Sequence, residues 1–222
     1  KDGLDLGEAC GLDVRLDAPV STDVDAVLAR PDIDVVFYTG IGSPTDVALK
    51  VAGTYASRPY GSILLVSVSD GETAAYFDDG GWLTDLRTAA VAAMAARELG
   101  RSDETLAILG TGVQARLQAS VHAEVLPLKA VRLWGRDAGR ARSCARDVEA
   151  ALSGVAVSVH ASPSEAAAGA GLVVTATAAR APLLGGGDLR PGTHVSAVGA
   201  DSPGKQELDA EILRRAALLL VD

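Results

Sequence analysis

Short runs of aliphatic and β-branched residues alternate with stretches of helical composition along the second half of the chain. From residue 105 onward these runs predict six buried strands. The expected strands are 105–109, 130–134, 155–159, 171–175, 194–198 and 217–221. The expected helices are 113–124, 139–152, 163–168 and 207–215, and residues 178–192 are expected to form a loop. This alternation implies right-handed crossovers and a parallel sheet.

The first hundred residues follow a less regular pattern. They predict a helix at 24–29, strands at 34–39, 62–69 and 73–77, and an Ala-rich helix from 84 to about 99. Asp70 and Gly71 are a turn signal between the last two of these strands. Thr84 is the expected N-cap of the long helix, and Gly100 is expected to close it.

The change of pattern near residue 100 predicts two units in a chain of 222 residues. Apolar residues make up 48% of the chain but aromatic residues only 4%, so we expect an aliphatic interior. Small aliphatic side chains suit the packing of helices against a sheet. The expected fold class is α/β, with a Rossmann-type doubly wound parallel sheet and a smaller α+β domain.

Charge and composition exclude several classes of partner. The formal net charge of −9 gives no basic patch for a nucleic acid or an anionic membrane surface. No apolar run reaches the ~18 residues of a membrane span, and the first residues lack the apolar core of a signal peptide. Cys10 and Cys144 are far apart in the sequence and are expected to be buried, reduced thiols. We therefore expect a cytoplasmic protein that binds neither nucleic acid nor membrane.

The segment LAILGTGVQA places the pattern G-x-G-x-x-A between an expected buried strand and an expected helix. In that context Gly110 permits a tight turn, Gly112 lets the backbone approach a pyrophosphate, and Ala115 lets the helix pack closely on the strand. The free N–H groups of the helix N-terminus would then face the phosphates. The candidate cofactor-binding residues of this turn are Gly110, Thr111, Gly112, Val113 and Gln114. A tight turn without a ligand is the alternative.

The end of the next expected strand bears on the type of cofactor. A site for NAD places Asp or Glu there to bind the ribose hydroxyls. This chain instead has Gly135, Arg136 and Asp137. Arg136 favours a 2′-phosphate and hence NADP, whereas Asp137 is still able to bind a ribose, so the expected cofactor is NAD(P). The alternative for Arg136 is a solvated surface cation.

Five segments carry further motifs, which are LTDLRTAAVAAMAARELG, ILGTGVQARLQ, LWGR, TATAARAPLL and VSAVGADSPGKQELDAEIL. In this order they resemble the ornithine cyclodeaminase and mu-crystallin family. The resemblance covers about residues 48–222 and does not extend to the first 45 residues. The family continues with further helices that are absent here, so we expect either a fragment or a partner that supplies them.

The resemblance implies a two-domain homodimer that acts on amino or imino acids. Residues 1–100 would form a partial substrate-binding and dimerisation domain, and residues 101–222 an NAD(P)-binding Rossmann domain. In the cyclodeaminases, NAD⁺ takes a hydride from the α-carbon, the side-chain amine attacks the resulting iminium, ammonia leaves and the hydride returns to the ring. L-Ornithine would thus give L-proline. The alternatives are a cyclic ketimine or imino acid reductase, an alanine-type dehydrogenase, and a non-catalytic NADP-dependent binding protein like mu-crystallin.

The resemblance also assigns three residues to the substrate. Lys50 in ALKVAG matches a lysine that meets the substrate, and Arg87 in the R-T-A-A element matches an arginine that binds the α-carboxylate, a planar anion suited to a guanidinium. Asp201 in GADSPGK matches the catalytic carboxylate, which takes a proton from the substrate. The alternatives are a solvated lysine, an ion pair of Arg87 with a nearby acid, and an Asx-turn at Asp201.

Other residues of the same motifs have supporting roles. Thr177, Val198 and Gly199 are expected to flank the nicotinamide, with backbone packing as the alternative. Lys205 and Glu207 are assigned to the loop and to the cap of the following helix.

The three histidines are scattered along the chain and fit neither a metal site nor a catalytic triad. We expect His122 on a helix surface, His160 at a strand end and His194 in a strand core. No metal ion is expected.

Overall fold

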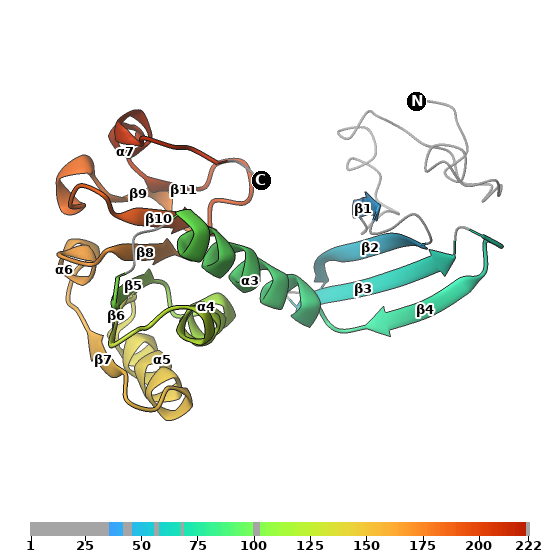
Figure 1. The fold of residues 1–222 in the computed structure, drawn as a ribbon, viewed down its shortest axis with the longest axis horizontal. Helices are drawn as coiled ribbons and strands as arrows, with labels where there is room; N and C mark the ends of the chain where they lie inside the picture. The colour runs from blue at the N-terminus through green and yellow to red at the C-terminus, as the bar shows by residue number, and fades with distance from the viewer. Residues whose placement is uncertain (1–35, 42–45, 56–57, 68, 100–102, 221–222) are drawn as a thin grey trace. The chain divides into compact units, whose positions relative to one another are not determined.

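The computed structural model describes residues 36–41, 46–55, 58–67, 69–99 and 103–220, with side chains described from Gly61 onward (Figure 1). The chain divides into two compact units, Lys1–Thr84 and Asp85–Asp222. The expected helix at 24–29, Cys10 and Gly100 lie outside the described residues. None of the described helices is long and apolar enough to cross a membrane.

An antiparallel sheet of four strands makes up most of the described part of the first unit. Its strands follow one another in the order β1 (Val36–Ile41), β2 (Asp46–Tyr55), β3 (Arg58–Ser67) and β4 (Thr73–Asp78). β3 and β4 confirm the predicted hairpin, and Gly71 in its turn has φ of 72°, which favours glycine. β2 was not predicted, because its sequence DVALKVAGTY interrupts the apolar alternation with Ala, Gly and paired apolar residues.

The long helix α3 (Trp82–Leu99) begins two residues before the expected N-cap. The carboxylate of Asp79 accepts a hydrogen bond from the Leu83 N–H at 2.6 Å, so Asp79 and not Thr84 caps the first turn. Gly80 and Gly81, with φ of 60° and 93°, make the tight turn that brings Asp79 to this place. The prediction of Thr84 as the N-cap was therefore wrong.

A five-stranded parallel sheet forms the centre of the second unit. Its strands are β5 (Thr105–Leu109), β6 (Ala130–Trp134), β7 (Ala156–Val159), β8 (Leu172–Thr175) and β10 (His194–Ala197). They lie in the order β10-β8-β5-β6-β7, which is the Rossmann order of a doubly wound sheet. The strand order reverses at β5, because β6 and β7 are added on one side of it and β8 and β10 on the other. Open parallel sheets bind ligands beyond the carboxyl ends of the strands at such a switch point.

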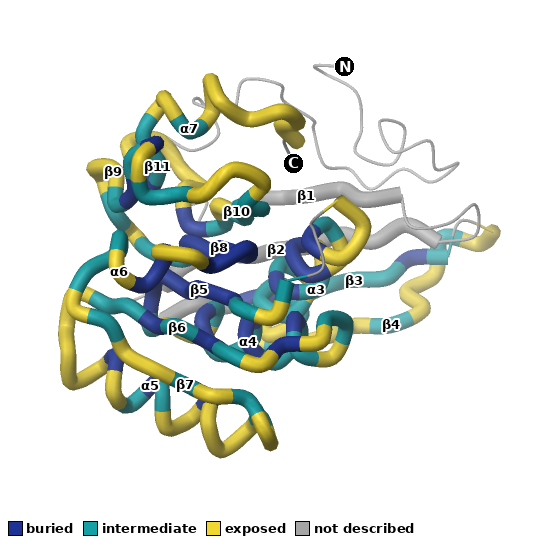
Figure 2. Tube along the Cα trace, turned by 60° about the vertical axis from the view of Figure 1, so that its left-hand side comes forward, coloured by how far each residue is buried: buried dark blue, intermediate teal, exposed yellow. Residues whose placement is uncertain are grey.

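Helices cover both faces of this sheet, as Figure 1 shows. On one face Leu106 and Ile108 of β5 pack in the core cluster that includes residues of α4 (Val113–Val125) and α5 (Ala138–Ala151). On the other face Ala107 and Leu109 pack with residues of α6 (Pro163–Ala167). β5 and β8 are buried along their length (Figure 2). Five predicted strands and three predicted helices are thus confirmed within one or two residues, and the α/β fold class is confirmed.

Two side chains in this core test separate predictions. Cys144 is buried on α5, as predicted. His122 is 1% exposed on α4, so the prediction of a surface histidine was wrong. The reason is that the face of α4 that carries His122 also carries buried Ala115, Gln118 and Ala119 and packs inward.

The segment from residue 178 to residue 215 differs most from the prediction. Residues 178–192 contain β9 (Arg180–Leu184) and the short 3-10 helix η1 (Gly186–Asp188) instead of an uninterrupted loop. The helix expected at 207–215 is shorter, α7 (Ala210–Arg215), because Gln206–Leu208 form β11, which pairs with β9 in a separate parallel sheet. A strand of three residues carries no periodic signal, and its partner strand defines it.

The sixth strand, expected at 217–221, is absent from the described residues 217–220. Leu218, Leu219 and Leu220 are 61%, 57% and 63% exposed, and no described strand pairs with them. An apolar run becomes a strand only when a neighbouring strand accepts its backbone hydrogen bonds.

Candidate active and cofactor-binding site

The glycine turn follows directly after β5. Gly110 has φ of 139°, and its N–H donates to the Trp134 carbonyl at 2.9 Å. A Cβ at Gly110 would lie 2.4 Å from the carbonyl oxygen of Ala176, so only glycine lets β5 end this close to the residue after β8. The positive φ of Gly110 agrees with the tight turn that the sequence predicts there, and the close approach of Gly110 to Ala176 is a further reason for glycine.

The N-terminus of α4 is open toward solvent. Gly112 is the N-cap of this helix and makes no side-chain cap hydrogen bond, and a Cβ at Gly112 would meet no atom within 4 Å. First-turn N–H groups without a side-chain cap attract anions. Arg116 supports the turn, because its guanidinium donates to the carbonyls of Thr111 and Gly112 at 2.8 and 3.1 Å.

A cavity of about 320 Å³ lies against this turn and is lined by Thr111, Gly112, Val113, Arg116, Arg140 and Ser143. Two guanidinium groups and the N-terminus of α4 give it a positive character. Asp147, which pairs with Arg116 at 2.6 Å, offsets part of that charge. The open space at Gly112 and the donors around it fit the phosphates of a dinucleotide.

Arg136 and Asp137, the predicted ribose or 2′-phosphate contacts, are exposed after β6. The Asp137 carboxylate accepts from the Arg140 N–H at 2.7 Å and caps α5. Asp137 therefore has a structural use that was not predicted, and one of its oxygens is engaged in it. Neither residue lines the cavity at the glycine turn.

A second cavity of about 200 Å³ lies beyond the carboxyl ends of β8 and β10. It is lined by Gln114, Ala176, Thr177, Ala178, Val198, Gly199, Asp201 and Lys205. Five residues that the sequence assigns to the cofactor or to catalysis thus meet in one cavity, although they lie up to 87 positions apart. Gln114 belongs to this cavity and not to the one at the glycine turn.

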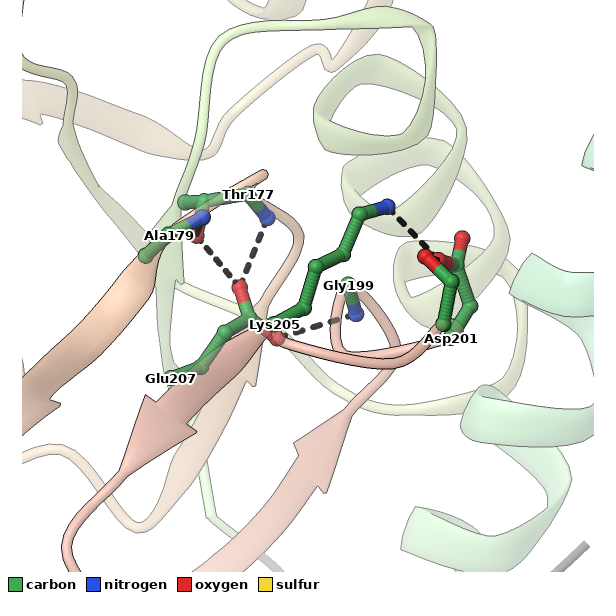
Figure 3. Close-up of polar contacts among 7 residues, drawn as sticks. Thr177, Ala179, Gly199, Asp201, Lys205 and Glu207 are labelled. Carbon is green, nitrogen blue, oxygen red and sulfur yellow. Dashed lines mark hydrogen bonds and ion pairs between the residues drawn. The ribbon is translucent and has the colours of Figure 1, made fainter.

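Asp201, the predicted catalytic residue, forms an ion pair with Lys205, whose Nζ lies 2.6 Å from Asp201 Oδ1 (Figure 3). Burial acts to raise the pKa of Asp201, but the hydrogen bonds from Lys205 and Ser202 and the positive charge of Lys205 outweigh it and lower the pKa below its usual 3.8. The side chain is 64% exposed, so the pair contributes little to stability. Asp201 is consequently a carboxylate at neutral pH, which is the form that accepts a proton.

The prediction that Glu207 caps the following helix was wrong, because Glu207 lies in β11 and Asp209 caps α7. Glu207 is 1% exposed, and its carboxylate accepts three hydrogen bonds from Thr177 and Gly199 (Figure 3). It accepts a fourth from the Thr175 hydroxyl. Glutamate is among the residues most often exposed, so composition gave no reason to bury it. The local sequence gave no signal for a strand with an inward glutamate, because Gln206 and Glu207 are both polar and three residues show no alternation.

The structure describes the side chain of only one of the two predicted substrate-binding cations, Arg87 and Lys50. Arg87 is exposed near the start of α3. Gln114, which lines the second cavity, donates to the Asp85 carbonyl at 2.9 Å and so attaches this end of α3 to the cavity wall. Lys50 lies on β2 opposite Tyr38 and Ile63, and its side chain is outside what the structure describes.

Among the described residues, no group of three or more His, Cys, Asp or Glu side chains is arranged to hold a metal ion. His160 follows β7 and contacts Arg132, and His194 begins β10 half-buried.

A doubly wound parallel sheet with a glycine turn at its switch point defines a dinucleotide-binding protein. The sequence matches the model of the ornithine cyclodeaminase/mu-crystallin family over residues 54–222. The chain belongs to this family.

Relatives in the family have several activities. The chain is 35% identical over 217 residues to an uncharacterized cyclodeaminase of Sinorhizobium fredii, covering 94% of this chain and 62% of the relative. It is 39% identical over 158 residues to the ketimine reductase mu-crystallin of Mus musculus, covering 71% of this chain and 49% of the relative. The chain thus spans about two fifths to three fifths of the length of the curated relatives that it matches.

Solved structures agree with this assignment. An archaeal alanine dehydrogenase dimer with bound NAD is similar with a TM-score of 0.74 and 27% identity, covering 82% of this chain and 61% of that chain. A lysine cyclodeaminase, described by its recognition of L-lysine, L-ornithine and L-2,4-diaminobutyric acid, is similar with a TM-score of 0.73 and 33% identity, covering 82% and 55%. A nicotinamide cofactor is therefore supported for the fold.

Proposed function

We propose that this chain is part of an NAD(P)-dependent enzyme of the ornithine cyclodeaminase type, which transfers a hydride at the α-carbon of an amino acid or its imine. The observation that carries the proposal is the second cavity, where Asp201 lies with Gln114, Thr177, Val198 and Gly199 beyond the carboxyl ends of the strands. A bound nicotinamide would supply the hydride acceptor and donor. The preferred reaction is the conversion of a diamino acid such as L-ornithine to L-proline with release of ammonia.

Each of the predicted site residues has a specific role in this proposal. Asp201 takes a proton from the substrate amine, since it is a carboxylate at neutral pH and lines the second cavity. Arg87 binds the α-carboxylate through its guanidinium, and Lys50 contacts the substrate. The glycine turn from Gly110 to Gly112 holds the phosphates of the cofactor.

The organisation of the protein follows from the same proposal. Residues 1–100 would be a partial substrate-binding and dimerisation domain, and residues 101–222 the cofactor domain of a cytoplasmic homodimer. The archaeal alanine dehydrogenase, which is described as a dimer, supports the homodimer.

Between the two cofactors, Arg136 favours NADP. Its guanidinium is exposed directly after β6, and the carboxylate that follows is already engaged in capping α5. A cation in place of a free acid at this strand end suits a 2′-phosphate better than bare ribose hydroxyls.

A second candidate function is reduction of a cyclic ketimine, or an alanine-type dehydrogenation. The mouse relative and the alanine dehydrogenase neighbour support it, and the reaction would use Arg87 and Asp201 without ring closure. A non-catalytic NADP-dependent binding protein is less consistent with the chain, because Asp201 and its ionising partner Lys205 are both present.

One experiment separates these functions. The purified chain is incubated with L-ornithine, L-lysine, L-alanine and the corresponding imines, with NAD⁺ or NADP⁺ or their reduced forms, and both cofactor absorbance and ammonia are followed. Ammonia without net cofactor reduction identifies a cyclodeaminase, and stoichiometric cofactor turnover identifies a dehydrogenase or reductase. Cofactor binding with no turnover on any substrate would contradict the proposal of an enzyme.

A further inference from the structure

We propose that Glu207 is a positioning residue that clamps the turn after β8 to the turn after β10 and thereby sets the place of Asp201. This inference rests on the proposed function for its catalytic meaning. The clamp itself is a property of the second unit and can be measured without substrate.

The carboxylate of Glu207 accepts hydrogen bonds at both oxygens. Oε1 accepts from the N–H and the hydroxyl of Thr177, both at 2.7 Å, and Oε2 accepts from the Thr175 hydroxyl at 2.8 Å and the Gly199 N–H at 2.9 Å. A carboxylate has about four lone-pair sites, so its acceptor capacity is used in full. This is the requirement for keeping a carboxylate in a site where only 1% of the residue is exposed.

The two turns approach so closely that no side chain fits between them. A Cβ at Gly199 would lie 2.4 Å from both the N and the O atoms of Thr177 and 2.6 Å from Glu207 Oε1. The backbone N–H groups of Thr177 and Gly199 both end on the same carboxylate (Figure 3). Glu207 is thus the common acceptor that holds the two strand ends together.

Pairing of β11 with β9 holds Glu207 itself. The Gln206 N–H donates to the Ala179 carbonyl at 2.8 Å, two residues beyond Thr177. The loop 199–207 is therefore fastened twice, at Gly199 by Glu207 and at Asp201 by Lys205. Because Thr177, Val198, Gly199 and Asp201 line the same cavity, loss of the Glu207 contacts releases its walls while the glycine turn after β5 stays intact.

The four hydrogen bonds of the clamp require a carboxylate at position 207, and a side chain of the same size is not sufficient. The variant Glu207→Gln keeps the shape, but one arm of its amide can only donate. Whichever way the amide turns, that arm faces a backbone N–H, of Gly199 or of Thr177, that also only donates. One clamp bond becomes a donor–donor contact, and the corresponding turn is released.

The test combines hydrogen exchange with kinetics on the full chain. In Glu207→Gln we expect amide exchange to rise about 10-fold or more in peptides that cover 175–178 and 198–201, and to stay unchanged in β6. We expect kcat to fall by about 10²-fold with KM changed less than about threefold, because misplacement of a catalytic group by about 1 Å has that effect on rate. Cofactor affinity is expected to stay within about threefold, since the phosphates are held elsewhere.

Two further variants keep the test decisive. Val131→Ala in the buried core of β6 is the matched control, because it lowers the melting temperature without touching either turn. It should raise exchange in β6 and leave kcat unchanged. Thr175→Val removes only the hydroxyl that donates to Oε2, so it should raise exchange near Gly199 and lower kcat less than Glu207→Gln does. Valine has nearly the same size as threonine, so the Thr175→Val variant still tests the clamp if Glu207→Gln does not fold.

Wild-type exchange in both turns of Glu207→Gln would overturn the clamp. Loosened turns with an unchanged kcat, or an equal loss of kcat in Val131→Ala, would overturn the positioning role. A wild-type chain without turnover on any substrate would refute the proposed function, while the exchange measurement would still decide whether Glu207 clamps the turns.

Discussion

Mild acid is expected to destabilise the second unit through His122. This side chain is 1% exposed, and its Nδ1 lies 2.8 Å from the Gln118 carbonyl, which only accepts, so Nδ1 carries the proton. Its Nε2 is buried without a hydrogen-bond partner in the part of the chain that the structure describes. Burial lowers the pKa of His122 from 6.5 to about 4, although the hydrogen bond to Gln118 acts in the opposite direction.

The direction of the effect follows from proton linkage. Between the folded pKa of about 4 and the unfolded pKa of 6.5, the unfolded chain binds more protons than the folded chain. The stability that neutral His122 contributes is complete above pH 6.5 and is lost as the pH falls toward 4. From these pKa values the loss is about 2 kcal/mol by about pH 5 and about 3 kcal/mol once the pH is below both values.

Urea unfolding followed by circular dichroism at about pH 7.5 and about pH 5 measures this loss. In His122→Gln the drop in unfolding free energy between the two pH values should be about 2 kcal/mol smaller than in the wild type. His160→Gln is the control, because burial and the charge of Arg132 also lower the pKa of His160, but that residue is much less buried. An equal drop in wild type and His122→Gln would refute the reasoning.

Three further predictions concern the proposed site. Asp201→Asn should lower kcat by roughly 10³-fold while cofactor affinity, measured by calorimetry, changes little, because it removes the proton acceptor alone. Gly110→Ala should lower both the melting temperature and the cofactor affinity, since its Cβ would lie 2.4 Å from the Ala176 carbonyl oxygen. Gly112→Ala should fold normally and lose only cofactor affinity, because its Cβ meets no protein atom within 4 Å. Arg136→Ala should weaken NADP⁺ binding by about 10-fold and leave NAD⁺ binding unchanged, as the loss of one charged hydrogen bond implies; equal losses for both cofactors would contradict a 2′-phosphate contact.

The parts of the fold that the sequence predicted are those that local pattern determines. The strands at 105–109 and 130–134 are apolar runs with clear ends, and Gly110 stands where a strand must turn sharply into a helix. The glycine turn and Asp201 could be predicted to lie near each other although they are far apart in the sequence. The reason is that the carboxyl ends of parallel strands meet at one edge of the sheet. The cavity that contains Gln114 and Asp201 follows from that topology.

The parts that were not predicted depend on partners distant in the sequence. β11 exists because β9 lies beside it, and Glu207 is buried because Thr175, Thr177 and Gly199 supply its donors. The Asp79 cap of α3 is different, because Asp79 and Leu83 are only four residues apart and the missed signal was the turn at the two glycines between them. The pairing of β11 and the burial of Glu207 are decided by hydrogen bonds that no short window of the sequence contains.

The most direct test of the central claim, hydride transfer at the α-carbon, uses L-ornithine and L-alanine that carry deuterium at that carbon. The chain is incubated with each substrate and cofactor, and the products are examined by mass spectrometry. The account predicts that the deuterium stays in the proline formed, or appears in the reduced cofactor if the chain is a dehydrogenase. Product in which the α-deuterium has been replaced by hydrogen from water would contradict it.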